Sequence, residues 1–394
     1  MTQAEAALLI VDDNEDNRYT LSQRLARDGY TNVATASNGR EALQLLQLRS
    51  FDLILLDIMM PEMNGYEVLE HLKASTKLRH LPVIMISAVD EMDSVIKCIE
   101  LGAEDYLAKP FNRTLLRARI GASLEKKQLR DEIRASLQRL ERELDAARTL
   151  QLGMLPRVFP ACTPEQPVQV YALMEPAREV GGDLYDCFYT SAEFFCFLVG
   201  DVSGKGAPAA MFMARTRSLV RMAVELWRQL SLEAISLARI ADIVNRELCQ
   251  NNDEHMFVTL FLGMLDTRKG VLAYVNAGHP VPCLLRAAGD IEQLDGKPQM
   301  PLGVRRNTAY QDRLATLRPG DAVLVATDGV IEAMDAVGAL YTSKRLDAVL
   351  GAVCKATPEE IVRAVTKDVD DFTGSAPKAD DATVLALRWQ PALS

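Results

Sequence analysis

Two sets of acidic residues, one in each half of the chain, have the types and positions that chemistry on phosphate groups requires. The first set is Asp12, Asp13 and Asp57, with Ser87 and Lys109 behind them, and the second is Asp183, Asp201, Asp328 and Asp380. Most of them lie beside short apolar runs, so they are expected at strand ends, where carboxylates can converge. Converging carboxylates repel one another unless a hard cation such as Mg²⁺ binds them. Each set therefore predicts a divalent-metal site.

Length and composition limit the kinds of protein that can carry these sites. The chain has 394 residues, 48% of them hydrophobic and 25% charged, which suits two to three globular domains. It has no run of about twenty apolar residues and no basic region before its first apolar stretch, so we expect a cytoplasmic protein without a membrane partner. The net charge of −10 disfavours nucleic acid as a partner. The seven cysteines form no CxxC pair, and we expect them to be reduced.

The elements that position the first set alternate along the chain. Leu8 to Val11, Leu53 to Leu56 and Val83 to Ile86 are continuous apolar runs, typical of strands in a parallel sheet covered on both faces. Amphipathic stretches lie between them, at Thr20 to Ala26 and Gly39 to Leu48. This order predicts an α/β doubly wound, flavodoxin-like domain, which we place at residues 1–122.

A charged segment without proline follows, and we assign residues 123–155 to a helical linker that ends before Pro156. Its apolar positions recur at spacings of four and three along one helical seam, at Ile133, Leu137, Leu140, Leu144 and Ala147. This spacing is typical of a coiled coil, and we predict a parallel homodimer. The alternative is a single helix that packs on its own domain.

The elements that position the second set are mixed in order. Strand-like runs occur at Val168 to Met174, Phe194 to Val199, Phe257 to Leu265, Val271 to Asn276, Ala322 to Ala326 and Thr383 to Trp389. Two helical blocks, about Ala207 to Trp227 and Leu232 to Gln250, separate them. This order predicts an α+β domain at residues 156–394.

The first acidic set also has the partners that a phosphoryl group needs. A hydroxyl at Ser87 and an ammonium at Lys109 are expected on the same rim as Asp57, where they could bind phosphoryl oxygens. The segments LLIVDDN, LILLDIMMPEMNGYE, VIMISA and DYLAKPF closely resemble response-regulator receiver domains over residues 6 to 122.

The resemblance to receivers implies a role for each of these residues. Asp57 would be phosphorylated by a histidine kinase or phosphotransfer protein, with Mg²⁺ as the cofactor. Asp12, Asp13, Asp57 and the Met59 carbonyl would bind that Mg²⁺. Ser87, Tyr106 and Lys109 would occupy the switch positions.

The second set combines carboxylates with glycines that permit a close backbone approach. Asp183 lies in EVGGDLYDCF, Asp201 ends an apolar strand before SGKGAPAA, Asp328 lies in ATDGVIEA, and Asp380 lies in KADDATVLALRW. Four carboxylates from distant parts of the chain can hold two divalent ions, which generate hydroxide from water and neutralise phosphate oxygens.

These motifs, with NAGHP at Asn276 to Pro280, resemble the metal-dependent (PPM) protein phosphatases of the bacterial SpoIIE-like branch over roughly residues 147 to 390. The resemblance implies a β-sandwich flanked by helices and two Mn²⁺ or Mg²⁺ ions. Asp201 would bridge both ions, Asp183 and the Val202 carbonyl would bind the second ion, and Asp328 and Asp380 would complete the first. The nucleophile would be the bridging water.

Several nearby residues have weaker assignments. GGDLYD is similar to the GGDEF signature of diguanylate cyclases, but Leu184 and Tyr185 replace the expected residues, so we set that function aside. Asp186 and Asp381 are expected to hydrogen bond around the site rather than to bind metal. His279 is expected to stabilise a turn. For Lys205, contact with an anion and simple exposure to solvent remain open.

The sequence therefore predicts a response regulator whose output is dephosphorylation of phosphoserine or phosphothreonine on a protein. The resemblance implies a phosphorylated anti-sigma factor antagonist as substrate, in a partner-switching pathway. One alternative is a phosphatase-like adaptor that has lost turnover and binds a partner according to the receiver's state. Another is a phosphatase of broad specificity.

Overall fold

The structure is a computed structural model that describes residues 4–88, 92–110, 112–178, 180–230 and 236–391. The chain forms two compact units, and the boundary between them along the sequence lies between Glu141 and Arg142. Within the described residues, no helix combines the length and the apolar character that crossing a membrane requires.

The first unit is built on a parallel five-stranded sheet with the strand order β2-β1-β3-β4-β5. Its strands are β1 (Ala7–Val11), β2 (Asn32–Ala36), β3 (Leu53–Asp57), β4 (Val83–Ser87) and β5 (Asp105–Ala108). The three apolar runs predicted as strands form β1, β3 and β4, whose residues are almost entirely buried. This is the doubly wound receiver architecture that the sequence predicted.

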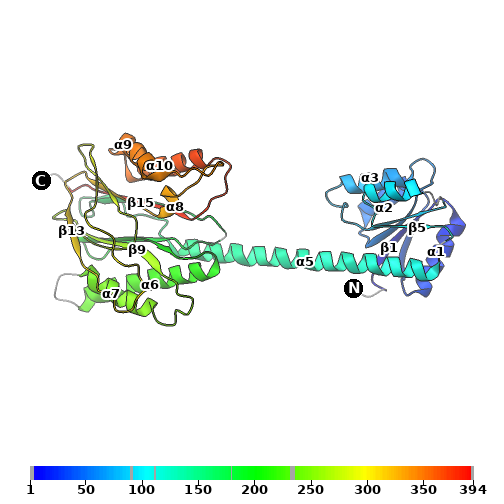
Figure 1. Cartoon of the computed structure of the whole chain (residues 1–394), viewed down its shortest axis with the longest axis horizontal. Helices are drawn as coiled ribbons and strands as arrows, with labels where there is room; N and C mark the ends of the chain where they lie inside the picture. Colours follow the sequence, from blue (N-terminus) through cyan, green and yellow to red (C-terminus); the bar gives the residue numbers. More distant parts are fainter. Residues whose placement is uncertain (1–3, 89–91, 111, 179, 231–235, 392–394) are drawn as a thin grey trace. The chain divides into compact units, whose positions relative to one another are not determined.

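Helices cover both faces of this sheet (Figure 1). The helices α2 (Gly39–Leu48), α3 (Gly65–Ala74) and α4 (Met92–Glu100) contribute to the core on one face. On the other face, the core includes α1 (Glu15–Arg27) and the first turns of α5 (Arg113–Met154). Asn14 caps α1 and Asn64 caps α3, and each side chain accepts hydrogen bonds from backbone N–H groups of the first helical turn.

The predicted linker is the continuation of the last helix of the first unit. A single helix, α5, runs from Arg113 to Met154 and ends before Pro156, as predicted. The seam residues Ile133, Leu137 and Leu140 are each more than half exposed on it.

The second unit is a sandwich of two antiparallel five-stranded sheets, with the strand orders β13-β10-β9-β8-β7 and β12-β11-β14-β15-β6. The strands of the first sheet are β7 (Leu184–Tyr189), β8 (Phe194–Val202), β9 (Val258–Asp266), β10 (Val271–Ala277) and β13 (Arg313–Thr316). Those of the second are β6 (Val168–Glu175), β11 (Cys283–Leu285), β12 (Ile291–Gln293), β14 (Ala322–Ala326) and β15 (Ala382–Trp389). Apolar side chains from the two inner faces form one core.

Helices cover the outer face of each sheet. The helices α6 (Ala207–Leu230) and α7 (Leu237–Leu248) pack on the first sheet, and α8 (Asp328–Ile331), α9 (Thr342–Val353) and α10 (Pro358–Thr373) pack on the second. This flanked sandwich confirms the predicted fold class. The predicted helix Leu232 to Gln250 is observed only as α7, and positions 232–235 lie outside the described residues.

Candidate functional site

The first acidic set gathers at the carboxyl ends of β1 and β3. These strands are neighbours, so Asp12 and Asp13, which follow β1, come close to Asp57, the last residue of β3. One carboxylate oxygen from each of the three residues lies within 4.8 Å of the other two. Asp12 and Asp57 are buried and Asp13 is exposed, so the cluster opens to solvent on one side. A hard cation with oxygen ligands suits this arrangement.

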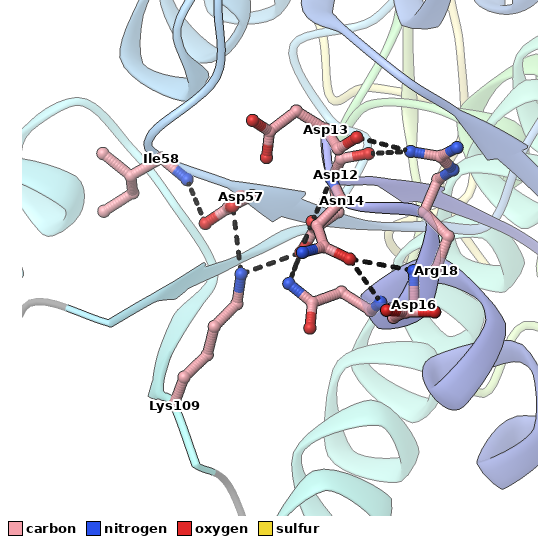
Figure 2. Close-up of polar contacts among 9 residues, drawn as sticks. Asp12, Asp13, Asn14, Asp16, Arg18, Asp57, Ile58 and Lys109 are labelled. Atoms are coloured by element: carbon pink, nitrogen blue, oxygen red, sulfur yellow. Dashed lines mark hydrogen bonds and ion pairs between the residues drawn. The ribbon is translucent and has the colours of Figure 1, made fainter.

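Lys109 lies between the two buried carboxylates (Figure 2). Its Nζ is 2.8 Å from Asp12 Oδ2 and 3.0 Å from Asp57 Oδ2. Burial lowers the pKa of Lys109, but these two hydrogen bonds outweigh burial and raise it above its ordinary value. Burial also raises the pKa of Asp57, and Lys109 opposes that rise. The ammonium therefore reduces the repulsion between the two acids.

Backbone contacts fix this cluster in place. Asp57 Oδ1 accepts a hydrogen bond of 2.9 Å from the Ile58 N–H. Arg18 donates to the carbonyls of Asp12 and Asp13, at 2.7 and 2.9 Å. Gly65 packs so closely that a Cβ there would lie 2.2 Å from the Asp57 carbonyl oxygen. Sequence reasoning missed Arg18. It lies on α1, six residues after Asp12, and its side chain reaches back to the end of β1.

The other predicted receiver residues lie on or beside the neighbouring strands. Ser87 is fully buried at the end of β4, the strand next to β3. Tyr106 lies on β5, opposite Met85 of β4. Met59 follows Ile58, and its side chain is exposed. The role of its carbonyl as a metal ligand stays a prediction.

The second acidic set comes from both sheets of the sandwich. Asp183 precedes β7 and Asp201 lies near the end of β8, whereas Asp328 follows β14 and Asp380 precedes β15. Burial, with the charges of Asp328 and Asp380, raises the pKa of Asp201 to about 7. Burial also raises the pKa of Asp328, and Glu332 and Asp380 add to that rise. Besides burial, the charges of Asp328 and Asp380 thus act on Asp201, and the charge of Asp380 acts on Asp328.

Asp183 is the most buried member of this set. Its Oδ2 accepts hydrogen bonds from Thr383 Oγ1 at 2.6 Å and from Thr327 Oγ1 at 2.9 Å. Its Oδ1 is buried without a hydrogen-bond donor. Burial and the charge of Asp201 raise the pKa of Asp183 well above its ordinary value. An orphaned carboxylate oxygen beside a second carboxylate fits a bound cation, because a cation would replace the missing donor.

Asp380 lies at the exposed side of the set, where it meets Lys205. Lys205 Nζ is 3.1 Å from Asp380 Oδ2 and donates to the Ala379 carbonyl. Thus Lys205, whose role the sequence left open, contacts one of the predicted ligands. In the part of the chain that the structure describes, the receiver acids are the only three that gather within 4.8 Å, so the second set is more spread out.

The second predicted backbone ligand lies beside the Asp183 loop. A Cβ on Gly182 would lie 2.9 Å from the Val202 carbonyl oxygen, so only glycine permits this approach. Asp381 accepts hydrogen bonds from the Gly182 and Ala177 N–H groups, at 2.6 and 2.8 Å. Asp381 therefore supports the loop, in line with its expected role. Sequence reasoning missed Thr327 and Thr383, although each lies within three residues of a predicted ligand.

Two further residues near the set have structural partners. Asp186 is fully buried and forms ion pairs with Arg217 and Arg221 of α6, at 2.9 and 2.8 Å. His279 is fully buried, and its backbone N–H donates to Asn276 Oδ1 at 2.8 Å. Burial lowers the pKa of His279 to about 3, so its ring is neutral near neutral pH. Both residues fit the supporting roles expected from the sequence.

Comparisons with known proteins match both units. Residues 192–390 match the family model of Stage II sporulation protein E (SpoIIE), and residues 8–121 match that of the response regulator receiver domain. Protein IcfG of Synechocystis sp. is 28% identical over 279 residues, which cover 65% of this chain and 42% of IcfG. The probable transcriptional regulator ycf27 of Cyanidium caldarium is 43% identical over 124 residues, 32% of this chain and 48% of that protein.

Among solved structures, the SiaA-PP2C domain of Pseudomonas aeruginosa superposes with a TM-score of 0.56 at 21% identity, covering 65% of this chain and 99% of that domain. This similarity establishes a shared fold. The matches to IcfG and ycf27 span less than half of the length of either protein. From the two family matches, the chain belongs to the SpoIIE family and carries a response regulator receiver domain before its PP2C-type phosphatase fold.

Proposed function

We propose that this chain is a response regulator whose output is metal-dependent dephosphorylation of phosphoserine or phosphothreonine on a protein. The second acidic set is the observation that carries this proposal. Four acids from two sheets interact there, and the most buried of them keeps an oxygen without a donor. Such a site costs free energy unless cations bind, so its presence favours catalysis by metal ions.

The residues of the second set would divide the binding of two Mn²⁺ or Mg²⁺ ions between them. Asp201, central among the charges, would bridge both ions, with Asp183 and the Val202 carbonyl on one side and Asp328 and Asp380 on the other. The ions would supply a hydroxide nucleophile and neutralise phosphate oxygens. Thr327 and Thr383 orient Asp183 through Oδ2 and leave Oδ1 to bind metal.

Lys205 is the cation at the open side of the second set. It pairs with Asp380 and is 38% exposed. An incoming phosphoprotein brings oxygen acceptors to this side, and the ammonium can orient them because it is only partly covered. We therefore assign Lys205 to substrate orientation.

We further propose that phosphorylation of Asp57 controls this output. Transfer of a phosphoryl group to an Asp57 oxygen would break its bond to the donor and turn the carboxylate that Lys109 contacts into an acyl phosphate, so Lys109 is placed to pair with the new charge. Mg²⁺ held by Asp12, Asp13 and the Met59 carbonyl would balance the remaining charge. The phosphodonor would be a histidine kinase or phosphotransfer protein, with Ser87 and Tyr106 responding to the change.

The finer assignment of substrate follows from the SpoIIE-like resemblance. We propose a small phosphorylated anti-sigma factor antagonist, whose dephosphorylation would change the partner of the anti-sigma factor. We also propose a homodimer, because the α5 seam residues Ile133, Leu137 and Leu140 are exposed in the single chain.

One assay tests the proposed function. The full chain is incubated with Mn²⁺ and a phosphoserine-containing antagonist protein, with and without a small phosphodonor, and phosphate release is measured. We expect release that requires Mn²⁺, stops when a chelator is added and changes with the phosphodonor. Binding of the antagonist without release would instead support the adaptor function.

A further inference from the structure

The end of helix α5 holds the metal-ligand loop of the second unit at a point just before Asp183. Gln151, in the last turn of α5, is only 5% exposed although it is polar. Its side-chain amide donates to the Gly181 carbonyl at 2.5 Å and accepts from the Gly181 N–H at 3.1 Å. The nitrogen and the oxygen of this amide therefore both hydrogen bond to the backbone of one residue, Gly181, two positions before Asp183.

A second contact lies just after Asp183. The hydroxyl of Tyr185 donates to the carbonyl of Pro156, which follows α5, at 2.8 Å. The end of α5 and the residues after it thus hold the GGDLYD segment on both sides of the acid. Leu155, between the two contacts, is buried in the core between the sheets, and Leu152 packs against that core. The last turn of α5 therefore belongs to the same packed body as the site.

The loop around Gly181 has little room to adopt another conformation if the contacts with Gln151 and Pro156 are lost. A Cβ on Gly181 would lie 2.4 Å from Asp381 Oδ2, and one on Gly182 would lie 2.9 Å from the Val202 carbonyl oxygen. The backbone is thus confined between Asp381, the neighbour of Asp380, and the predicted ligand Val202. A shift of Gly181 would consequently move Asp183 relative to the other ligands.

Gln151 also lies in register with the exposed seam of α5. From Ile133, the seam positions follow at spacings of four, three, four and three to Ala147, and the next spacing of four gives Gln151. A rotation of the helix that changes the seam would therefore also turn the Gln151 amide. The contact provides a direct route from the state of the helix to the metal-binding loop.

We propose that Gln151 is a positioning residue that sets the place of Asp183 through the backbone of Gly181, so that the end of α5 adjusts metal affinity at the second acidic set. The structural part of this proposal concerns the loop alone, and its effect on turnover rests on the proposed phosphatase function. Loss of a residue that orients a metal ligand typically lowers metal affinity about 10- to 100-fold.

The test compares Gln151→Met with a matched control on the same turn. Methionine keeps the length and volume of the side chain but removes both hydrogen bonds. Arg148→Met makes the same residue at an exposed position of α5. Tyr185→Phe removes only the second contact. Hydrogen exchange at the Gly181 amide is measured in the full metal-free chain. Mn²⁺ binding is measured by calorimetry. Any heat from the receiver site is the same in all variants and cancels in the comparison.

For Gln151→Met, we expect at least about 10-fold faster exchange at Gly181 and Mn²⁺ binding weakened about 10- to 100-fold. Turnover should recover at high Mn²⁺, and the unfolding temperature should stay near that of Arg148→Met. Unchanged exchange at Gly181, or unchanged Mn²⁺ binding, would overturn the proposal. Altered exchange and binding in a chain whose wild type releases no phosphate would instead reject the phosphatase function and leave the role of Gln151 intact.

Discussion

The two acidic sites of this chain balance their charges in different ways. In the first unit, three carboxylates lie at the ends of adjacent parallel strands, and Lys109 contacts two of them. In the second unit, four carboxylates come from two different sheets, and Lys205 forms an ion pair with the exposed Asp380. Burial raises the pKa of both Asp183 and Asp201. The charge of Asp201 adds to the rise at Asp183, and the charges of Asp328 and Asp380 add to the rise at Asp201.

This difference indicates which site is complete without metal. Lys109 pairs with two of the receiver acids, so the chain itself balances part of their charge. On the proposals above, the second set would depend on bound ions for its charge balance and on the backbone around Gly181 for its geometry. The activity of such a site is easier to regulate than that of a site balanced by its own cation, because a small displacement of one ligand changes metal affinity strongly.

The largest expected effect comes from removing carboxylates of the second set. Asp201→Ala and Asp328→Ala should each lower phosphate release from a phosphoserine protein at least about 100-fold, because the metal ions contribute several kcal/mol to the barrier. Circular dichroism should show a folded chain, and labelling of Asp57 should persist. Near-normal metal-dependent turnover in either variant would contradict the two-metal site.

The corresponding change in the receiver should have the opposite pattern. Asp57→Asn should reduce labelling by a small phosphodonor in Mg²⁺ to background, since the amide cannot form an acyl phosphate. Basal phosphate release by the second unit should remain, but its response to the phosphodonor should disappear. Equal labelling of the variant and the wild type would place the acceptor at another residue.

A smaller effect is expected when the route between the two sites is cut in α5. Leu140→Asp with Leu144→Asp puts like charges into the seam and should dissociate the proposed dimer. Turnover of a small generic phosphate ester should persist, while the response to the phosphodonor should be lost. Light scattering and the activity assay measure the two outcomes.

The control for this prediction adds the same charge on the outer face of the helix. Gln138→Asp with Ala146→Asp should leave both the dimer and the phosphodonor response unchanged. Full phosphodonor control in a monomeric Leu140→Asp, Leu144→Asp variant would show that the signal does not pass through the seam.

The sequence predicted the parts of the fold whose apolar patterns are long or continuous. The runs that form β1, β3 and β4 were identified to within one residue at each end, since both faces of these strands are buried. Short edge strands were missed, such as β12 (Ile291–Gln293), whose residues are mostly exposed. The helix α10 was also missed, although Thr357 and Glu360 form a capping box at its start.

The acids that the structure brings together in each unit were singled out from the sequence, but their supporting contacts were not. Asp57 ends a strand whose apolar run is plain in the sequence, and it lies in a recognisable motif. The bonds from Gln151 to Gly181 and from Gly182 to Asp381 join residues 30 and 199 positions apart. No local pattern links such positions, because only the packing of the sandwich brings them together. Supporting residues of this kind require a structure.

The smallest effect tests the unbalanced charge of the second set directly. The pKa of Asp201 is raised to about 7 in the fold by burial, Asp328 and Asp380, against about 3.9 in an unfolded chain. Between these values the folded state binds more protons than the unfolded state, so stability must fall as pH rises. The free energy of unfolding of the metal-free second unit should fall by about 2 kcal/mol between about pH 5.5 and pH 7.

Asp201→Asn should flatten this slope, and added Mn²⁺ should reverse it, because the ions favour the ionised form. Calorimetric unfolding across this range measures the slope. A metal-free wild type that becomes more stable as pH rises would mean that burial and the neighbouring charges do not raise the pKa of Asp201 as the structure indicates.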